Sequence, residues 1–228
     1  MLKKEKIKEL EEKIGYEFKR KELIWQALTH SSFSNEQKIN KYKNYERLEF
    51  LGDAVLELLS SQFFFETYPE MPEGEMTKLR SSMVCELALA YCARDISLGD
   101  YLLLGKGEET TGGRTRDSII SDVMEAVIGA LYLDGGLSVA DEFVKKYILS
   151  DLESKQLFYD SKTILQEEVQ RDGQSLTYEL VSEIGPDHDK VFAVEAKIDG
   201  RTVGRGQGRN KKSAQQQAAY QALLARKK

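Results

Sequence analysis

The spacing of apolar residues changes once along this chain of 228 residues, and that change limits the folds it can adopt. In 24–28, 48–65, 79–93 and 119–133, apolar side chains recur at the three- and four-residue intervals of an amphipathic helix. From 176 to 207 they alternate with polar residues, as in half-buried β-strands. We therefore predict a multidomain protein: an all-α domain at 1–152, a linker at 153–159 and a small α+β domain at 160–228.

The small domain is predicted to have the element order α-β-β-β-α. We expect helices at 160–171 and 210–226, strands at 176–183, 190–199 and 202–207, and a hairpin turn at Asp199-Gly200. After Asp199 the chain contains eight cations and no anion, although the whole protein has a net charge of -5. Such a basic end is typical either of a solvated terminus or of a nucleic-acid contact.

Glycine and proline residues predict where the helices of the first domain end. The segment 68–74 contains two prolines and should separate two helices, 105–116 is expected to be an exposed, mobile polar loop, and Gly135-Gly136 should end a helix. No apolar run is long enough to span a membrane, and the first thirteen residues lack the apolar block of a secretion signal. With only two cysteines, expected to be reduced core thiols, we predict a cytoplasmic protein without a disulfide or zinc site.

The most informative segment is 44–59, where an acidic stripe borders an apolar helix face. At about 100° per residue, Glu46, Glu49, Asp53 and Glu57 fall within an arc of roughly 80° that contains no lysine. A second apolar helix, at 119–133, carries Asp122 and Glu125 three residues apart and therefore on one face. Carboxylates gathered beside apolar helices must face water, become protonated or bind cations. A site for hard divalent cations, an exposed acidic ridge and a capping role all fit these residues.

The motifs of this chain resemble those of the bacterial ribonuclease III family in order and over nearly the whole length. Glu46-Arg-Leu-Glu-Phe-Leu-Gly-Asp53 matches the signature of that family at every position, and further likeness lies in 14–18, 27–32, 73–77 and 122–134. Residues 160–228 resemble a double-stranded-RNA-binding domain, through 162–167, 185–188, 204–208 and Lys211-Lys212. The resemblance therefore implies an all-α endonuclease domain followed by an α+β RNA-binding domain.

The resemblance also implies an activity and a set of site residues. It implies an endoribonuclease that hydrolyses double-stranded RNA with Mg²⁺ (or Mn²⁺), leaves 5′-phosphate and 3′-hydroxyl ends, and processes ribosomal and other RNA precursors. Asp53 and Glu125 would be catalytic, Glu49, Asp53, Asp122 and Glu125 would hold the metal, and Glu46 and Glu73 would be additional acids of the site. Phe50 would contact the other subunit of a homodimer.

In the second domain the resemblance assigns RNA contacts to three places. These are one face of the first helix, the loop after the first strand and the start of the last helix, with Thr163, Gln166, Gln170, Pro186, His188, Asn210, Lys211 and Lys212. Two other functions fit parts of this pattern: a double-stranded-RNA-binding protein without catalysis, and a metal-dependent phosphohydrolase of small molecules. The intact carboxylates of both helices argue against the first, and the RNA-binding-like module argues against the second.

Overall fold

The computed structural model describes residues 4–38, 40, 42–152, 155, 157, 160–185, 190–208 and 210–226. The chain forms two compact units, 1–150 and 151–228, each with its own core. Only residues 155 and 157 of the predicted linker at 153–159 are described, so its exact bounds stay a prediction. Within the described residues, no helix is long and apolar enough to cross a membrane.

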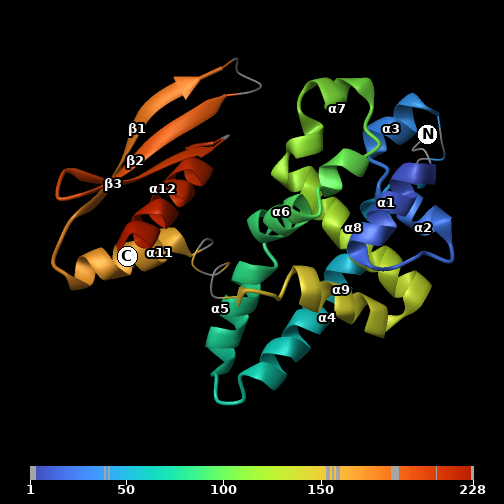
Figure 1. Ribbon diagram of the computed structural model, residues 1–228, viewed down its shortest axis with the longest axis horizontal. Helices are drawn as coiled ribbons and strands as arrows, with labels where there is room; N and C mark the ends of the chain where they lie inside the picture. The colour runs from blue at the N-terminus through green and yellow to red at the C-terminus, as the bar shows by residue number, and fades with distance from the viewer. Residues whose placement is uncertain are drawn as a thin grey trace. The chain divides into compact units, whose positions relative to one another are not determined.

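The first unit is built from helices, as predicted (Figure 1). Its long central helix α8 is apolar around most of its circumference between Ile119 and Leu131, so it can be stable only when other helices surround it. Helices α2, α4, α6 and α9 pack against it. The elements are α1 (Lys4–Ile14), α2 (Lys21–Ala27), α3 (Ser31–Glu36), α4 (Glu46–Thr67), α5 (Glu73–Met83), α6 (Glu86–Asp95), η1 (Leu98–Tyr101), α7 (Lys106–Thr110), η2 (Gly113–Thr115), α8 (Asp117–Gly135) and α9 (Leu137–Tyr147).

The breaks between helices follow the proline and glycine signals, with one exception. Helix α4 ends at Thr67, just before the predicted break at 68–74, and α5 begins at Glu73, near the end of that break. Helix α8 ends before Gly136, whose φ of 84° favours glycine. The prediction of one helical run at 79–93 is wrong, because Cys85 has extended backbone between α5 and α6. Both helices bury apolar side chains in the same core, so the apolar spacing continues across the break.

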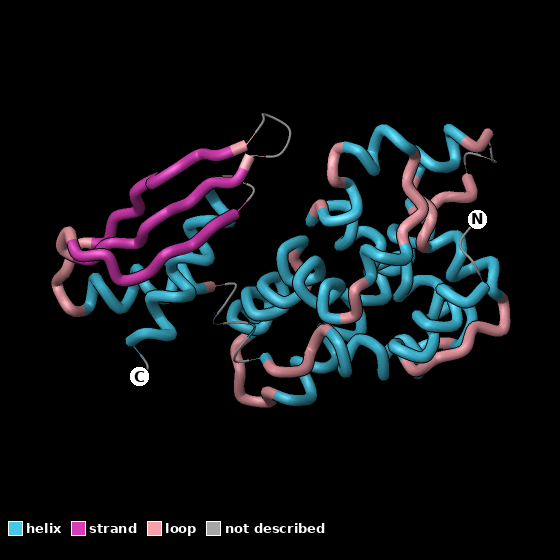
Figure 2. The backbone as a smooth tube through the Cα atoms, turned by 45° about the horizontal axis from the view of Figure 1, so that its top comes forward, coloured by secondary structure: helices cyan, strands magenta, loops and turns pink. Residues whose placement is uncertain are grey.

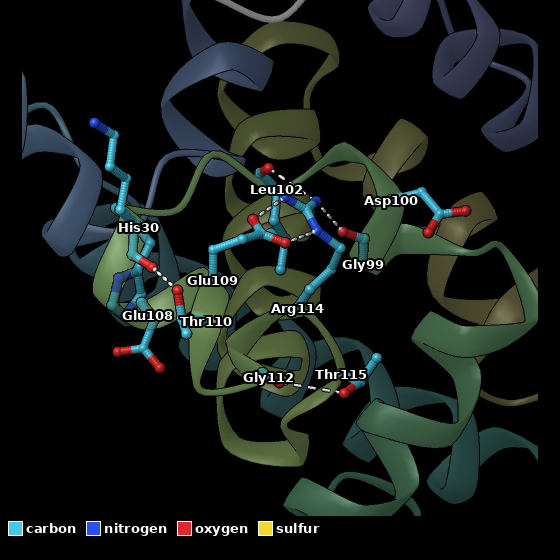
Figure 3. A network of polar contacts seen from close by, with 12 residues as sticks. His30, Gly99, Asp100, Leu102, Glu108, Glu109, Thr110, Gly112, Arg114 and Thr115 are labelled. Atoms are coloured by element: carbon cyan, nitrogen blue, oxygen red, sulfur yellow. Dashed lines mark hydrogen bonds and ion pairs between the residues drawn. The ribbon is translucent and has the colours of Figure 1, made fainter.

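Most of the segment 105–116 is exposed or half-exposed, as predicted, but the prediction of a loop is wrong because the segment forms short helices. It contains α7 and η2, and Arg114 fastens it to the rest of the unit (Figure 3). The Arg114 guanidinium donates to the carbonyl oxygens of Gly99 at 2.7 Å and Leu102 at 3.0 Å, and its Nε donates to Glu109 Oε1 at 2.8 Å. Arg116, at the start of α8, forms an ion pair with Glu108. Glycine and threonine content indicated a loop, whereas these arginine contacts stabilise short helices.

The second unit has the predicted order α-β-β-β-α, and all the named strands lie in it (Figure 2). It consists of α11 (Ser161–Arg171), β1 (Leu176–Ile184), β2 (Val191–Ile198), β3 (Arg201–Gly208) and α12 (Lys211–Arg226). The strands form an antiparallel sheet in the order β1-β2-β3. Asp199 and Gly200 both have positive φ, 49° and 79°, and make the predicted tight turn between β2 and β3.

Small residues let α12 lie close to the sheet. Val194, Ala196 and Ile198 of β2 point into a core that contains alanines of α12. A Cβ added to Gly206 of β3 would lie 2.3 Å from the carbonyl oxygen of Ala214, so only glycine permits this separation. The packing fixes α11 and α12 on one side of the sheet, as drawn in Figure 1.

Candidate active site

The candidate site lies where α4 crosses α8, and two glycines set the distance between these helices. A Cβ added to Gly52 would lie 1.8 Å from the carbonyl oxygen of Glu125, and one added to Gly129 would lie 2.3 Å from that of Leu48. The backbones are therefore in direct contact. Gly52 precedes Asp53, so the crossing brings the acidic stripe of α4 beside Asp122 and Glu125 of α8.

Four carboxylates, Glu49, Asp53, Asp122 and Glu125, form one electrostatic cluster at this crossing. Burial, followed by the charges of Asp53, Asp122 and Glu49, raises the pKa of Glu125 to about 8. Burial likewise raises the pKa of Glu49 to about 7, with contributions from Asp122, Glu46 and Asp53. The charges that perturb these two groups are all negative. The crossing therefore holds like charges together in a partly desolvated place.

This set of donors fits a hard divalent cation. Four carboxylates supply oxygen ligands, and a cation among them would offset the repulsion that, after burial, raises the pKa of Glu49 and Glu125. In the conformation of the structure, no group of three or more His, Cys, Asp and Glu side chains within the described residues is arranged to hold a metal ion. The four acids are therefore electrostatic neighbours, and they must draw closer to coordinate one ion together.

Two residues of this site were missed by the sequence analysis. The hydroxyl of Tyr45 donates to Asp122 Oδ2 at 3.3 Å, and burial together with the charge of Asp122 raises the pKa of that tyrosine, so it remains a donor. The charge of Glu86, at the start of α6, contributes to the raised pKa of Asp122, for which burial is the main cause. Tyr45 adjoins the signature and Glu86 follows Cys85, but neither residue type reveals a partner on a distant helix.

The remaining predicted residues of the first unit lie around the cluster. Glu46 is exposed at the first position of α4, and its charge acts on Glu49. Glu73 is exposed on α5, where its Oε1 accepts a hydrogen bond from Thr77 at 2.8 Å, and it is not among the charges that raise the pKa values of Glu49, Asp122 and Glu125. Phe50 is 81% exposed on α4.

The second unit presents the predicted RNA contacts on two helices. Thr163, Gln166 and Gln170 lie along one face of α11, and Thr163 and Gln170 are exposed. Lys211 and Lys212 are exposed at the start of α12, where Asn210 Oδ1 accepts the backbone N–H of Ser213 at 2.8 Å. A helix start with exposed lysines favours phosphate. The predicted contacts Pro186 and His188 lie outside the described residues.

Comparisons with known proteins agree with this division of the chain. Residues 20–152 match the family described as Ribonuclease-III-like, and residues 161–225 match the double-stranded RNA binding motif. A protein of Bacillus velezensis named Ribonuclease 3 is 48% identical over 98% of this chain and 91% of the relative. The Ribonuclease 3 of Caldanaerobacter subterraneus is 49% identical over 94% of this chain and 95% of the relative.

A solved structure is similar to the first unit. The nuclease domain of ribonuclease III from Campylobacter jejuni has 42% sequence identity and a TM-score of 0.58, covering 62% of this chain and 95% of that domain. That structure is described as showing structural flexibility in a region involved in dimer formation of the nuclease domain. Sequence and fold therefore lead to the same relatives.

Proposed function

This chain belongs to the ribonuclease III family, and from that premise we propose that its acidic cluster at the crossing of α4 and α8 is the catalytic centre. The protein is an endoribonuclease specific for double-stranded RNA and depends on a divalent metal ion. We assign the ion as Mg²⁺, with Mn²⁺ as a substitute, and the products as 5′-phosphate and 3′-hydroxyl ends. The enzyme would process ribosomal and other RNA precursors in the cytoplasm.

The observation that carries this proposal is the convergence of Glu49, Asp53, Asp122 and Glu125 at one helix crossing, where the charges of Asp53 and Asp122 help to raise the pKa of both Glu49 and Glu125. These four side chains would hold the ion, and Asp53 and Glu125 would act directly at the scissile phosphate. When bound, the ion supplies an activated water and neutralises charge on the leaving oxygen. The protein contributes a rigid crossing that keeps the acids together and a partly desolvated setting that strengthens their attraction for a cation. Glu46 and Glu73 would add negative charge at the edge of the site.

The second unit would bring the duplex to this centre. A-form RNA presents a shallow minor groove and regularly spaced phosphates, so proteins bind its shape more than its sequence. Thr163, Gln166 and Gln170 would contact a minor groove, while Lys211 and Lys212 would contact phosphates with Asn210 beside them. Pro186 and His188 would reach a second minor groove. No covalent link to the enzyme is required for hydrolysis.

We also propose that the protein acts as a homodimer. On α4, Phe50, Leu58 and Phe65 are 81%, 55% and 72% exposed and lie within about 80° of one another around the helix axis. An exposed apolar stripe of this kind is typical of a protein–protein contact. Two copies would provide two centres, one for each strand of a duplex. Sedimentation showing a monomer at micromolar concentration would overturn this part.

The decisive experiment is cleavage of a long, perfectly paired RNA. With Mg²⁺ we expect short duplex products whose ends carry 5′-phosphate and 3′-hydroxyl groups, and with chelator in excess we expect no cleavage. Single-stranded RNA of the same sequence should remain intact. Cleavage in chelator, or 3′-phosphate ends, would contradict the proposed chemistry.

A further inference from the structure

The acid Asp122 differs from its three neighbours in having a fixed partner. Within the described part of the chain, it is the one carboxylate of the cluster that receives a hydrogen bond from the side chain of another element, the hydroxyl of Tyr45. The two residues are 77 positions apart in sequence; Asp122 lies in α8, and Tyr45 immediately precedes α4. The bond therefore connects α8 to the residue at the start of α4.

Tyr45 is itself held from several sides. It is only 6% exposed, and its ring lies 5.6 Å from that of His30. Its backbone N–H donates to the carbonyl oxygen of Thr29 at 2.9 Å, and Thr29 is fully buried in a bridge with Leu103. A side chain that is fixed this well can fix the carboxylate that it contacts.

The backbone of Tyr45 also contacts α4, the other helix that carries acids of the cluster. Its carbonyl oxygen accepts the N–H of Leu48 at 2.8 Å and the N–H of Glu49 at 2.9 Å, so it forms the first turn of α4. One residue thus binds the backbone of Glu49 and the side chain of Asp122. Any movement of Tyr45 would change the position of both acids.

We propose that Tyr45 is a positioning residue, which orients Asp122 relative to Glu49 for binding of the divalent ion. This inference rests on the proposed function of the acidic cluster. Groups that hydrogen-bond to a metal ligand restrict its orientation, and their loss typically weakens metal binding by about 10- to 100-fold. Because the Tyr45–Asp122 bond is long, at 3.3 Å, we expect about the tenfold end of that range.

The test is the binding of Mn²⁺ to the full-length protein without RNA, measured from the electron paramagnetic resonance of the free ion. Tyr45→Phe keeps the ring and removes only the hydroxyl, and it should bind Mn²⁺ about tenfold more weakly than wild type. Tyr16→Phe is the matched control, since the Tyr16 hydroxyl donates to Asp134 at 2.9 Å at the far end of α8. That control should bind Mn²⁺ with wild-type affinity.

A double-mutant cycle separates positioning from a general loss of structure. If Tyr45 acts through Asp122, then Tyr45→Phe should weaken binding only slightly in a protein that already carries Asp122→Asn. Wild-type affinity in Tyr45→Phe, or an equal loss in both backgrounds, would overturn the proposal for Tyr45. If wild type binds Mn²⁺ no more tightly than Glu125→Gln does, the assignment of the metal site fails as well, and with it the role of Tyr45.

Discussion

In the first unit, four acids of one sign lie half-buried or exposed around a crossing of two helices, and in the second unit the lysines expected to bind RNA lie exposed at a helix start. Repulsion between the acids must be opposed by the scaffold, which Gly52 and Gly129 hold at backbone contact. The exposed lysines keep their hydration and need no such restraint. Under the proposed function, catalysis would depend on acids held together against their repulsion, whereas RNA binding would depend on exposed lysines.

The largest effect should come from removing one charge of the acidic cluster. We expect Glu125→Gln to slow cleavage of duplex RNA by about a thousandfold or more, equivalent to about 4 kcal/mol, while RNA binding persists. Glu142→Gln, an equal change of charge on an exposed residue of α9, should cleave at the wild-type rate. Cleavage by Glu125→Gln at the wild-type rate in excess Mg²⁺ would contradict the proposed catalytic role of the acidic cluster.

The same substitution, Glu125→Gln, should stabilise the folded protein even though it slows cleavage. Because the pKa of Glu125 is raised above its ordinary value, the ionised form is disfavoured in the folded state. The stabilisation that the folded protein gains from the protonated Glu125 carboxyl group is complete below pH 4.5 and is lost as the pH rises toward 8. Without metal, Glu125→Gln should therefore melt at a higher temperature than wild type at pH 8, and the difference should shrink at low pH. Scanning calorimetry in chelator measures this.

The next largest effect tests the glycine crossing itself. Gly52→Ala would place a methyl group on the Glu125 carbonyl, so the helices must separate, at a cost of about 3 kcal/mol or more. Gly74→Ala in α5 is the control, because nothing lies within 4 Å of its added Cβ, and it should be neutral or slightly stabilising. Equal unfolding free energies for the two variants in urea would show that the crossing tolerates separation.

The acid Asp134 differs from the acids of the cluster because its carboxylate accepts hydrogen bonds from several groups. Burial would raise the pKa of Asp134, but hydrogen bonds from the Lys19 and Arg20 backbone and the Tyr16 hydroxyl bring it below its ordinary value. Its stabilisation is therefore present above pH 3.8 and lost as the pH falls through the folded-state pKa. We expect Asp134→Asn to lose about 2 kcal/mol of unfolding free energy at pH 7 and progressively less below pH 4. A loss that does not depend on pH would contradict this.

The smallest effect should be found at the binding surface. Lys212→Ala should weaken binding to duplex RNA at all sequences and reduce the slope of log affinity against log salt by about one. Lys8→Ala, which removes an exposed charge from α1, should leave both quantities unchanged. A normal salt slope in Lys212→Ala would mean that this ammonium group does not meet a phosphate.

Local patterns in the sequence predicted most of the helices, the order of elements in the second unit and the acidic stripe, because each depends on residues close together in the chain. The boundary between α5 and α6 was not predicted, since both helices bury apolar residues in one core. The short helices of 105–116 are held by Arg114, whose backbone partners lie 12 and 15 residues away in the sequence. The bond between Tyr45 and Asp122 joins still more distant positions, and no spacing rule could reveal it.

The contact between α4 and α8 is made by main-chain atoms, with Gly52 against the Glu125 carbonyl and Gly129 against that of Leu48. The frame of the site therefore does not depend on which side chains project from it. We therefore expect the helices to keep their separation when the acids at positions 49, 53, 122 and 125 are exchanged for histidine or asparagine. That makes this crossing a useful platform for redesigning metal preference, provided that both glycines are left in place.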